Sequence, residues 1–206
     1  MTKPRIVLKD GESAIFGYGS LLLKRHMELT LGRAGNNNFM TCILDGWGRT
    51  WDVIMPNYKF YEATTAGQFV PKNIIYLNIQ PRPGGMLNGV LFVVRPEELL
   101  AFDRREWIYN RHVVTSQIQD VEVLGGEVFA YVAKPEALLP GDASRSFAAI
   151  RRSYLDVVEE GLRELGSEFR SLYERSTQAV PLDLVIHDQK LDDGTNPLLA
   201  EAKSHG

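Results

Sequence analysis

Strand-like segments with short connections occupy the first two-thirds of the chain, and they constrain its fold more than any other feature. Each is a short run of apolar, β-branched or aromatic residues between turn signals. These runs predict strands at residues 13–18, 39–44, 49–54, 73–79, 87–94, 111–118 and 128–133. A glycine-containing turn at 45–48 and a proline–glycine turn at 81–85 are expected to separate neighbouring strands. The regular strand–helix alternation of a doubly wound fold is missing.

Helical patterns are few before residue 140 and dominate after it. Residues 20–32 fit a short helix or coil that stops at Gly32, and Pro96 followed by two acids predicts a helix ending near Arg105. After residue 141, apolar residues recur at helical spacing and predict helices at 144–161 and 168–177. Strands outnumber helices, which favours an α+β fold with a mixed, partly closed barrel-like sheet and helices packed outside.

Length and composition are those of an ordinary soluble protein. The 206 residues are 44% hydrophobic and 24% charged, and we predict one domain over 1–206, with a core of about 13–178. The polar tail at 181–206 is expected to be loosely held. A net charge of −3 gives no reason to expect nucleic acid or an anionic membrane as a partner. A lone cysteine, Cys42, and the lack of a visible signal peptide or membrane-spanning run predict a cytoplasmic protein.

The segment Phe16-Gly17-Tyr18-Gly19-Ser20-Leu21 is the first candidate for a binding site. Glycines at a strand end permit a positive φ or close approach to a ligand, with outward N–H groups that suit an anionic or carbonyl oxygen. Leu22 stands where a dinucleotide loop needs its third glycine, and Tyr18 and Leu22 where a serine-hydrolase elbow needs glycine. A tight structural turn explains the segment equally well.

The carboxylate of Glu106 is the second candidate, because it lies at a predicted helix-to-strand junction, where loops often carry function. The apolar neighbours Trp107 and Ile108 would partly desolvate it, whereas Arg105 would lower its pKa. A solvated surface carboxylate is the alternative. The histidines have no paired spacing, so no metal site is expected. Cys42 and the tryptophans at 47 and 51 are expected to pack in the core.

Taken together, these segments resemble the gamma-glutamylcyclotransferase-like superfamily, which includes the ChaC-type glutathione-degrading enzymes and the plant AIG2-like proteins. The resemblance covers roughly residues 14–175 in the expected order, but 56–72 and the polar tail match nothing in it. The matching segments are 16–21, 102–106 and 109–114, with further similarity at 45–51, 76–78, 88–92, 153–155 and 160–162.

The resemblance implies an enzyme without a cofactor that releases 5-oxoproline from a gamma-glutamyl compound. Glu106 would take the acid/base position, and main-chain N–H groups of residues 19–21 would hold either the developing oxyanion or the substrate's α-carboxylate. Arg111 would pair with a substrate carboxylate or form a structural salt bridge. The implied substrate-binding residues are Tyr18, Gly19, Ser20, Leu21, Tyr109 and Arg111.

Two other functions are compatible with the same residues. One is a non-catalytic or regulatory module that binds a gamma-glutamyl-type small molecule. The other is a related amide-bond enzyme that acts on a gamma-glutamyl adduct of a metabolite, with residues 56–72 shaping its pocket. In each case the partner is a small gamma-glutamyl molecule, not nucleic acid or a membrane, and a homodimer is an alternative to a monomer.

Overall fold

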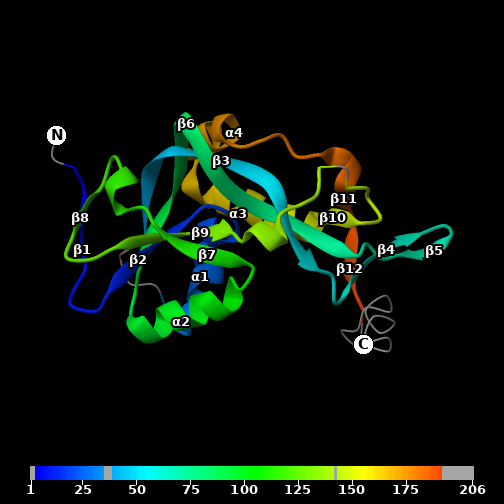
Figure 1. Ribbon diagram of the computed structural model, residues 1–206, viewed down its shortest axis with the longest axis horizontal. Coiled ribbons are helices and arrows are strands. Elements are labelled where there is room, and N and C mark those ends of the chain that lie inside the picture. Colours follow the sequence, from blue (N-terminus) through cyan, green and yellow to red (C-terminus); the bar gives the residue numbers. More distant parts are fainter. Residues whose placement is uncertain (1–2, 35–38, 142, 192–206) are drawn as a thin grey trace.

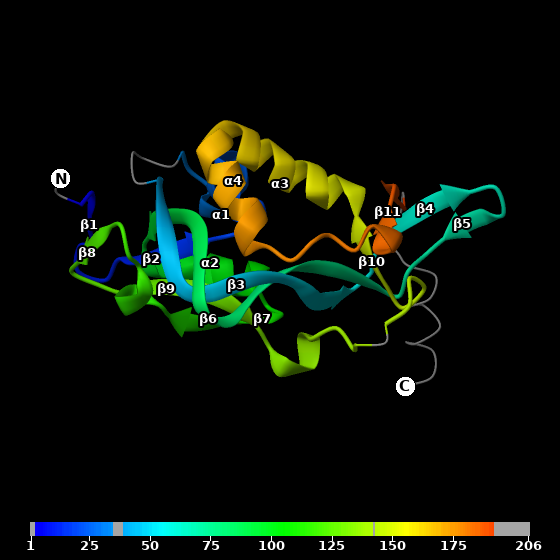
Figure 2. The ribbon, with the colours of Figure 1, turned by 90° about the horizontal axis from the view of Figure 1, so that it is seen from above.

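A computed structural model describes residues 3–34, 39–141 and 143–191 and has the predicted α+β class (Figure 1). Two long strands, β3 (Met40–Pro56) and β6 (Asn73–Val94), pair antiparallel along almost their whole length. The helices α3 (Arg152–Leu165) and α4 (Ser167–Ser176) lie on one side of this pair (Figure 2). The curved pair β3–β6 is therefore the frame on which the other elements pack.

The main sheet runs in order through β11 (Val185–Ile186), β10 (Ala148–Arg151), β6, β2 (Ser13–Gly17), β9 (Val128–Ala133) and β7 (Tyr109–Val113). It is mixed, because β2 runs antiparallel to β6 and parallel to β9, and β10 runs parallel to β6. Within the described residues the pairing is an open path from β11 to β7, with β3 added on β6. Strand β2 lies in the middle of this sheet and ends at Gly17, so the predicted binding segment at 16–21 lies beside the hydrophobic core.

The predicted turns at 45–48 and 81–85 are wrong, because β3 and β6 continue through both segments. The pairing steps from Asp45 opposite Met86 to Trp47 opposite Pro81, so the extra residues form an irregularity inside one ladder. Gly46 has a φ of +81°, which a glycine adopts at little cost. The glycines and prolines thus mark a bulge that bends the strand pair, and pairing resumes on either side.

The helices before residue 110 agree with the sequence. A single 3-10 turn, η1 (Ser20–Leu22), is followed by α1 (Lys24–Leu31), and Gly32 caps α1 with a left-handed φ of +68°. Helix α2 (Pro96–Arg105) has the predicted start and end. The predicted strand at 111–118 is shorter: β7 ends at Val113, and residues after Val114 form the 3-10 turn η2 (Thr115–Gln117).

The predicted helix at 144–161 is wrong in its first part. Residues 148–151 form β10, which pairs in parallel with the start of β6, and α3 begins only at Arg152. The run Ala148-Ala149-Ile150 is buried, with exposures of 0–1%. A short run that is apolar on both faces fits a buried strand or a buried helix equally well, and only its neighbours decide between them. Helix α4 agrees with the prediction at 168–177.

Several strands were not predicted. The hairpin β4 (Phe60–Thr64) and β5 (Gly67–Phe69) comes from the segment that the resemblance left unmatched, and β12 (Asp188–Lys190) pairs with β4. This small sheet projects from one end of the main sheet (Figure 1). At the other end β1 (Arg5–Val7) pairs with β8 (Glu122–Leu124), and the 3-10 turns η3 (Pro135–Ala137) and η4 (Leu182–Leu184) complete the elements. Of the tail predicted at 181–206 to be loosely held, residues 182–190 form η4, β11 and β12, and both strands are paired. Residues 192–206 lie outside the described residues.

One hydrophobic core joins the main sheet to α3 and α4. As predicted, Cys42, Trp47 and Trp51 are buried, with exposures of 1%, 7% and 4%. No helix in the described ranges is long and apolar enough to cross a membrane.

Candidate active site

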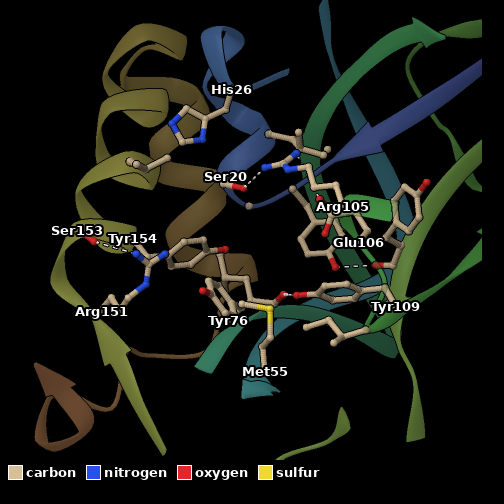
Figure 3. A pocket seen from close by; sticks show the side chains of 18 of the residues that line it. Ser20, His26, Met55, Tyr76, Arg105, Glu106, Tyr109, Arg151, Ser153 and Tyr154 are labelled. Carbon is tan, nitrogen blue, oxygen red and sulfur yellow. Dashed lines mark hydrogen bonds and ion pairs between the residues drawn. The ribbon is translucent and has the colours of Figure 1, made fainter. Parts of the chain in front are cut away.

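A cavity of about 520 Å³ lies between the start of α3 on one side and, on the other, the C-terminal end of α2 with the neighbouring strands of the main sheet (Figure 3). This volume falls in the usual range for small-molecule sites. The loop after β2 forms one wall, and the junction between α2 and β7 forms another. Six of the seven predicted site residues line it, although they come from segments about ninety residues apart: Tyr18, Gly19, Ser20, Leu21, Glu106 and Tyr109.

The glycines of the loop are required by close packing and not by a positive φ, which neither Gly17 nor Gly19 has. A Cβ on Gly17 would lie 2.8 Å from Cβ of Leu21, and a Cβ on Gly19 would lie 2.9 Å from the hydroxyl oxygen of Tyr154. Directly after Gly19 the chain enters η1, where the N–H of Leu22 donates to the Gly19 carbonyl at 3.0 Å. The first N–H groups of such a turn have no partner within the turn.

The contact between Gly19 and Tyr154 gives a testable prediction. For the reaction proposed below, we expect Gly19→Ala to lower kcat/KM at least about 10-fold, because the new methyl group displaces either the loop or the Tyr154 ring, and misplacing groups at a reaction site by about 1 Å is costly. Removing the hydroxyl with Tyr154→Phe relieves this contact, since the remaining neighbours lie at 3.7 Å. Steady-state kinetics of both single variants and the double variant should therefore show partial rescue. A double variant in which the two losses simply multiply would contradict this steric explanation.

Beneath the loop lies Arg49, which is not among the predicted site residues. Its side chain is fully buried, and its Nε donates to the carbonyl of Tyr18 at 2.8 Å. Its Nη2 donates to the carbonyl of Asn88, its Nη1 donates to Ser176 Oγ at 3.0 Å, and the guanidinium lies 4.2 Å from the ring centre of Tyr173. Burial lowers the pKa of Arg49 to about 10, so it stays protonated at neutral pH. One signal for its burial was present in the sequence. Arg49 lies two residues from Trp47 and two from Trp51 in one strand, and residues at this spacing share a face of the sheet.

Glu106 caps the C-terminus of α2 and points its carboxyl into the cavity. The backbone fixes it on both sides, because its N–H donates to Phe102 and its carbonyl accepts from Tyr109, each at 2.8 Å. Its side chain is only 17% exposed, which rules out a solvated surface carboxylate. Burial raises the pKa of Glu106, while the Arg105 guanidinium opposes the rise, with Nη1 of Arg105 3.3 Å from Oε1 of Glu106. Trp107, expected to help desolvate the carboxyl, is 47% exposed instead.

Tyrosine side chains line the same cavity as Glu106. The hydroxyl of Tyr18 donates to the Tyr131 carbonyl at 2.6 Å, and the hydroxyl of Tyr109 donates to the Leu77 carbonyl at 2.8 Å. Burial is the main cause that raises the pKa of both tyrosines, and the nearby charge of Glu106 adds to it. Tyr18 and Tyr109 are therefore neutral, and each hydroxyl proton is already donated to a main-chain carbonyl. The two side chains thus shape the cavity and hold its walls in place.

Known structures resemble this arrangement of elements. A structure described as a gamma-glutamyl cyclotransferase superimposes with a TM-score of 0.53, covering 95% of this chain and 99% of that one at 14% identity. The chain has the gamma-glutamyl cyclotransferase fold. YkqA from Bacillus subtilis superimposes with a TM-score of 0.52 and 15% identity over 80% of this chain, but only 53% of YkqA is covered. No protein-family model matches the sequence, and no curated protein does. The fold implied by the resemblance is thus confirmed.

Within this gamma-glutamyl cyclotransferase fold, Arg111 lies outside the cavity. Its Nε is 3.0 Å from Oδ1 of Asp103, which also accepts a hydrogen bond from the hydroxyl of Tyr131 at 2.9 Å. Of the two roles considered for Arg111, the geometry fits the structural salt bridge. Tyr109 and Arg111 are two residues apart on β7 and therefore share a face of the sheet. Arg111 lies farther along the strand, opposite Tyr131, and its guanidinium lies 5.1 Å from the ring centre of Phe129 and not in the cavity.

Two other arginines line the cavity instead. Arg105 donates from Nη2 to Ser20 Oγ at 3.0 Å, and its Nη1 is buried beside Glu106 without a hydrogen-bond partner in the described part of the chain. Arg151 lies on the other side, at the end of β10. The sequence predicted for Arg105 only an effect on the pKa of Glu106, and it did not point to Arg151, because an arginine inside an expected helix carries no signal of its own.

Proposed function

We propose that the protein is a gamma-glutamyl cyclotransferase-type enzyme, which converts a gamma-glutamyl group into 5-oxoproline and releases an amine. The observation that carries this proposal is a single carboxyl, that of Glu106, desolvated in the same cavity as the loop that follows β2. A buried acid with a raised pKa in a cleft is a typical arrangement for proton transfer.

In the proposed reaction the α-amine of the substrate attacks its own γ-carbonyl carbon. A C–N bond forms to close the five-membered lactam, and the C–N bond to the leaving amine breaks. The attacking nitrogen passes from ammonium to lactam N–H and gives up two protons. Glu106 relays them one after the other to the leaving nitrogen, so the amine leaves as an ammonium ion and no net proton is gained or lost. The reacting groups are already tethered, and good alignment of such groups is worth roughly 7–11 kcal/mol. The protein therefore needs no nucleophile of its own.

The raised pKa of Glu106 makes this proton transfer easier. An unperturbed glutamate has a pKa of about 4.3 and an α-amino group about 8, so direct transfer would be uphill by roughly 5 kcal/mol. Desolvation of Glu106 reduces that difference, and the carboxyl then holds the accepted proton until the leaving nitrogen takes it.

The remaining polar groups of the cavity suit the glutamyl group. The guanidinium of Arg105 lines the cavity next to Glu106, so we assign it to the substrate's α-carboxylate, which is bonded to the same carbon as the α-amine. The N–H groups at the start of η1 are then available to the γ-carbonyl oxygen, where negative charge develops.

The direct test is incubation of the purified chain with a gamma-glutamyl dipeptide, a gamma-glutamyl alkylamide and glutathione, with 5-oxoproline quantified by mass spectrometry. The matched control is the same dipeptide acetylated on its α-amine, which cannot cyclise. We expect 5-oxoproline from at least one free-amine substrate and no reaction of the acetylated one. Release of free glutamate, or turnover of the acetylated dipeptide, would show hydrolysis instead. Saturable binding without any turnover would support the non-catalytic module.

Ser20→Ala should be tolerated. The Ser20 hydroxyl accepts one hydrogen bond from Arg105, and water in the cavity can replace it, so we expect kcat/KM to fall by at most about 10-fold. Steady-state kinetics on the best substrate measure this. A loss as large as that of a Glu106 variant would instead indicate acyl transfer through the serine.

Arg105→Met should change the pH dependence of the reaction. Ionised Glu106 is the base, so kcat/KM should rise with pH through the pKa of Glu106 in the free enzyme. Arg105 lowers that pKa, so its removal should move the rising limb to higher pH. We also expect KM to increase about 10- to 100-fold through loss of a charged hydrogen bond. The substrate amine titrates equally in both enzymes, so the pH–rate profiles can be compared directly; an unshifted limb would contradict the assignment of Glu106.

A further inference from the structure

We propose that a second cavity, separate from the candidate active site, binds a small anionic molecule with an apolar body. This second cavity has a volume of about 320 Å³ and lies between β1, α1, the end of β6 and the start of α2. The ligand class is a carboxylate, or an acid of the same charge, attached to a short alkyl chain or a single ring. This inference goes beyond the proposed function and does not rest on it.

Helix α1 separates the second cavity from the active-site cavity. His26 lines the active-site cavity, whereas Met27 and Leu31 line the second one. Met27 and Leu31 are four residues apart and therefore lie on the same face of the helix. No described residue lines both cavities. A molecule in the second cavity therefore does not compete with a substrate for space.

The floor of the second cavity is apolar. Met27 and Phe92 are buried, with exposures of 1% and 2%, and the ring centre of Phe92 lies 5.4 Å from that of Phe102 in the core. The apolar residues that line the cavity are Val7, Met27, Leu31, Phe39, Phe92 and Val93. Covering such a surface with an apolar group is favourable. The volume lies at the lower end of the range for small-molecule sites, which suits a ligand with one short chain or one ring.

The rim of the second cavity is mostly cationic. Lys9, Arg33 and Arg95 line it together with one carboxylate, that of Glu12. One turn fixes Lys9 and Glu12, because the N–H of Lys9 donates to Oε2 of Glu12 and the N–H of Glu12 donates to the Lys9 carbonyl, each at 2.9 Å. The ammonium group of Lys9 has no hydrogen-bond or ion-pair partner among the residues that the structure describes. It is therefore available to an anion.

The two arginines of the rim share a single buried carboxylate, that of Glu98. Arg33 donates to it from Nε and Nη2 at 2.5 and 2.9 Å, and Arg95 donates from Nε and Nη2 at 3.1 and 2.8 Å. Glu97 lies 3.2 Å from Arg95 but is 64% exposed and does not line the cavity. Within the described ranges neither Nη1 group contacts a carboxylate, and that of Arg33 has only a 3.5 Å contact with the Ala34 carbonyl. Glu98 thus holds both guanidinium groups in place without using all their donors.

These groups determine the chemistry of the ligand. Guanidinium and ammonium groups form their strongest hydrogen bonds with carboxylate and similar anionic oxygens. An anionic group at the rim would accept hydrogen bonds from Lys9 and from the free Nη1 groups, while its apolar body covers Met27 and Phe92. A neutral apolar molecule would gain only the apolar contacts, and a cation would be repelled by the rim. The cavity therefore favours an anion over a neutral molecule of the same shape.

Two methionines report separately on the two cavities, because Met27 lines the second cavity and Met55 lines the active-site cavity. The test is NMR of the full chain with isotope-labelled methionine methyl groups, whose signals are assigned with Met27→Leu and Met55→Leu. We expect phenylacetate to shift the Met27 signal saturably and to leave the Met55 signal in place. Neutral phenylacetamide, which has the same shape, should bind at least about 10-fold more weakly, as for a lost charged hydrogen bond.

Lys9→Met tests the charged rim. Arg33 and Arg95 are left unchanged, because removing either would expose buried Glu98 to the loss of a partner. We expect Lys9→Met to bind phenylacetate about 2- to 5-fold more weakly, the usual value of an exposed ion pair, and to bind phenylacetamide as the wild type does. Lys9→Arg keeps the charge and should retain the affinity. Lys59→Met is the matched control, because Lys59 is an exposed lysine next to β4 and outside the cavity.

Four results would overturn the inference. These are the lack of a saturable shift at Met27, equal affinity for phenylacetate and phenylacetamide, a shift at Met55 without one at Met27, and an unchanged phenylacetate affinity in Lys9→Met. None of these measurements depends on turnover. The proposed function is tested separately by the formation of 5-oxoproline, so either proposal can fail while the other stands.

Discussion

Glu106→Gln is expected to lower kcat by about 10²–10⁴ on any gamma-glutamyl substrate, which is the usual contribution of a general acid–base group. Glutamine keeps the size of the side chain and its place at the end of α2, but it cannot exchange a proton at neutral pH. The tethered geometry and the groups around the glutamyl site are unchanged, so KM should change little. The loss should therefore be found in kcat, with residual turnover above the uncatalysed rate.

The same substitution should not destabilise the fold. Burial raises the pKa of Glu106 above its value in the unfolded chain, so the folded state binds the proton more tightly. Stability from such a group is present below the unfolded pKa and is lost as pH rises through the folded pKa. A neutral glutamine avoids this loss. Thermal unfolding followed by circular dichroism should show an unchanged or higher midpoint for Glu106→Gln at pH 7, with the difference between variant and wild type shrinking toward pH 4.

Glu174→Gln is the matched control for this substitution, because Glu174 is 63% exposed on α4 and far from the proton-transfer step. It should change neither kcat nor the midpoint. Near-normal kcat in Glu106→Gln would end the assignment of Glu106 as the acid–base group. A low midpoint together with low activity would show that the carboxyl is needed for folding, which the raised pKa argues against.

The parts of this site that were predictable from sequence are those with a local signal. The strand that ends in glycines around Tyr18, and the acid at the end of a proline-initiated helix, each indicate a backbone junction. Whether the two junctions meet depends on β2 lying between β6 and β9, a topology that no local pattern gives. The family resemblance supplied that link, because it joins segments in order along the chain.

The parts that were not predictable depend on contacts between segments distant in sequence. Gly46 and the segment at 81–85 have the composition of turns. However, β3 and β6 pair with each other before and after these residues, which therefore form one irregularity inside the strand pair. Ala148–Arg151 has the composition of a buried helix, and its pairing with the start of β6 makes it a strand. Arg151 lines the cavity because it is the last residue of β10.

Arg49→Met is expected to destabilise the chain by about 2–6 kcal/mol, because it leaves the carbonyls of Tyr18 and Asn88 without their donor and each buried unsatisfied group costs about 1–3 kcal/mol. Methionine has a similar length and fits an apolar site, so lost hydrogen bonds account for the effect more than a cavity does. Urea unfolding measures this loss. The matched control is the exposed Arg152→Met, for which less than about 0.5 kcal/mol is expected.

The effect of Arg49→Met on activity is a separate expectation. Arg49 links three elements, because it donates to the loop after β2, to β6 and to Ser176 at the end of α4. Without it, the Tyr18 carbonyl is free to rotate, and the N–H groups that follow in η1 lose their fixed direction. We expect kcat per folded molecule to fall at least about 10-fold at a temperature where the variant remains folded, with KM less affected, because preorganised donors act mainly on the transition state.

Arg49→Lys separates the charge of Arg49 from its hydrogen-bond geometry. Lysine keeps a cation beside the ring of Tyr173, but its donors diverge from one nitrogen and cannot span the loop, β6 and α4 together. We therefore expect Arg49→Lys to resemble Arg49→Met in kcat more than it resembles the wild type. Full activity in Arg49→Lys would show that charge alone holds the loop. Lost stability with unchanged kcat per folded molecule would show that Arg49 anchors α4 and has no part in directing the loop toward substrate.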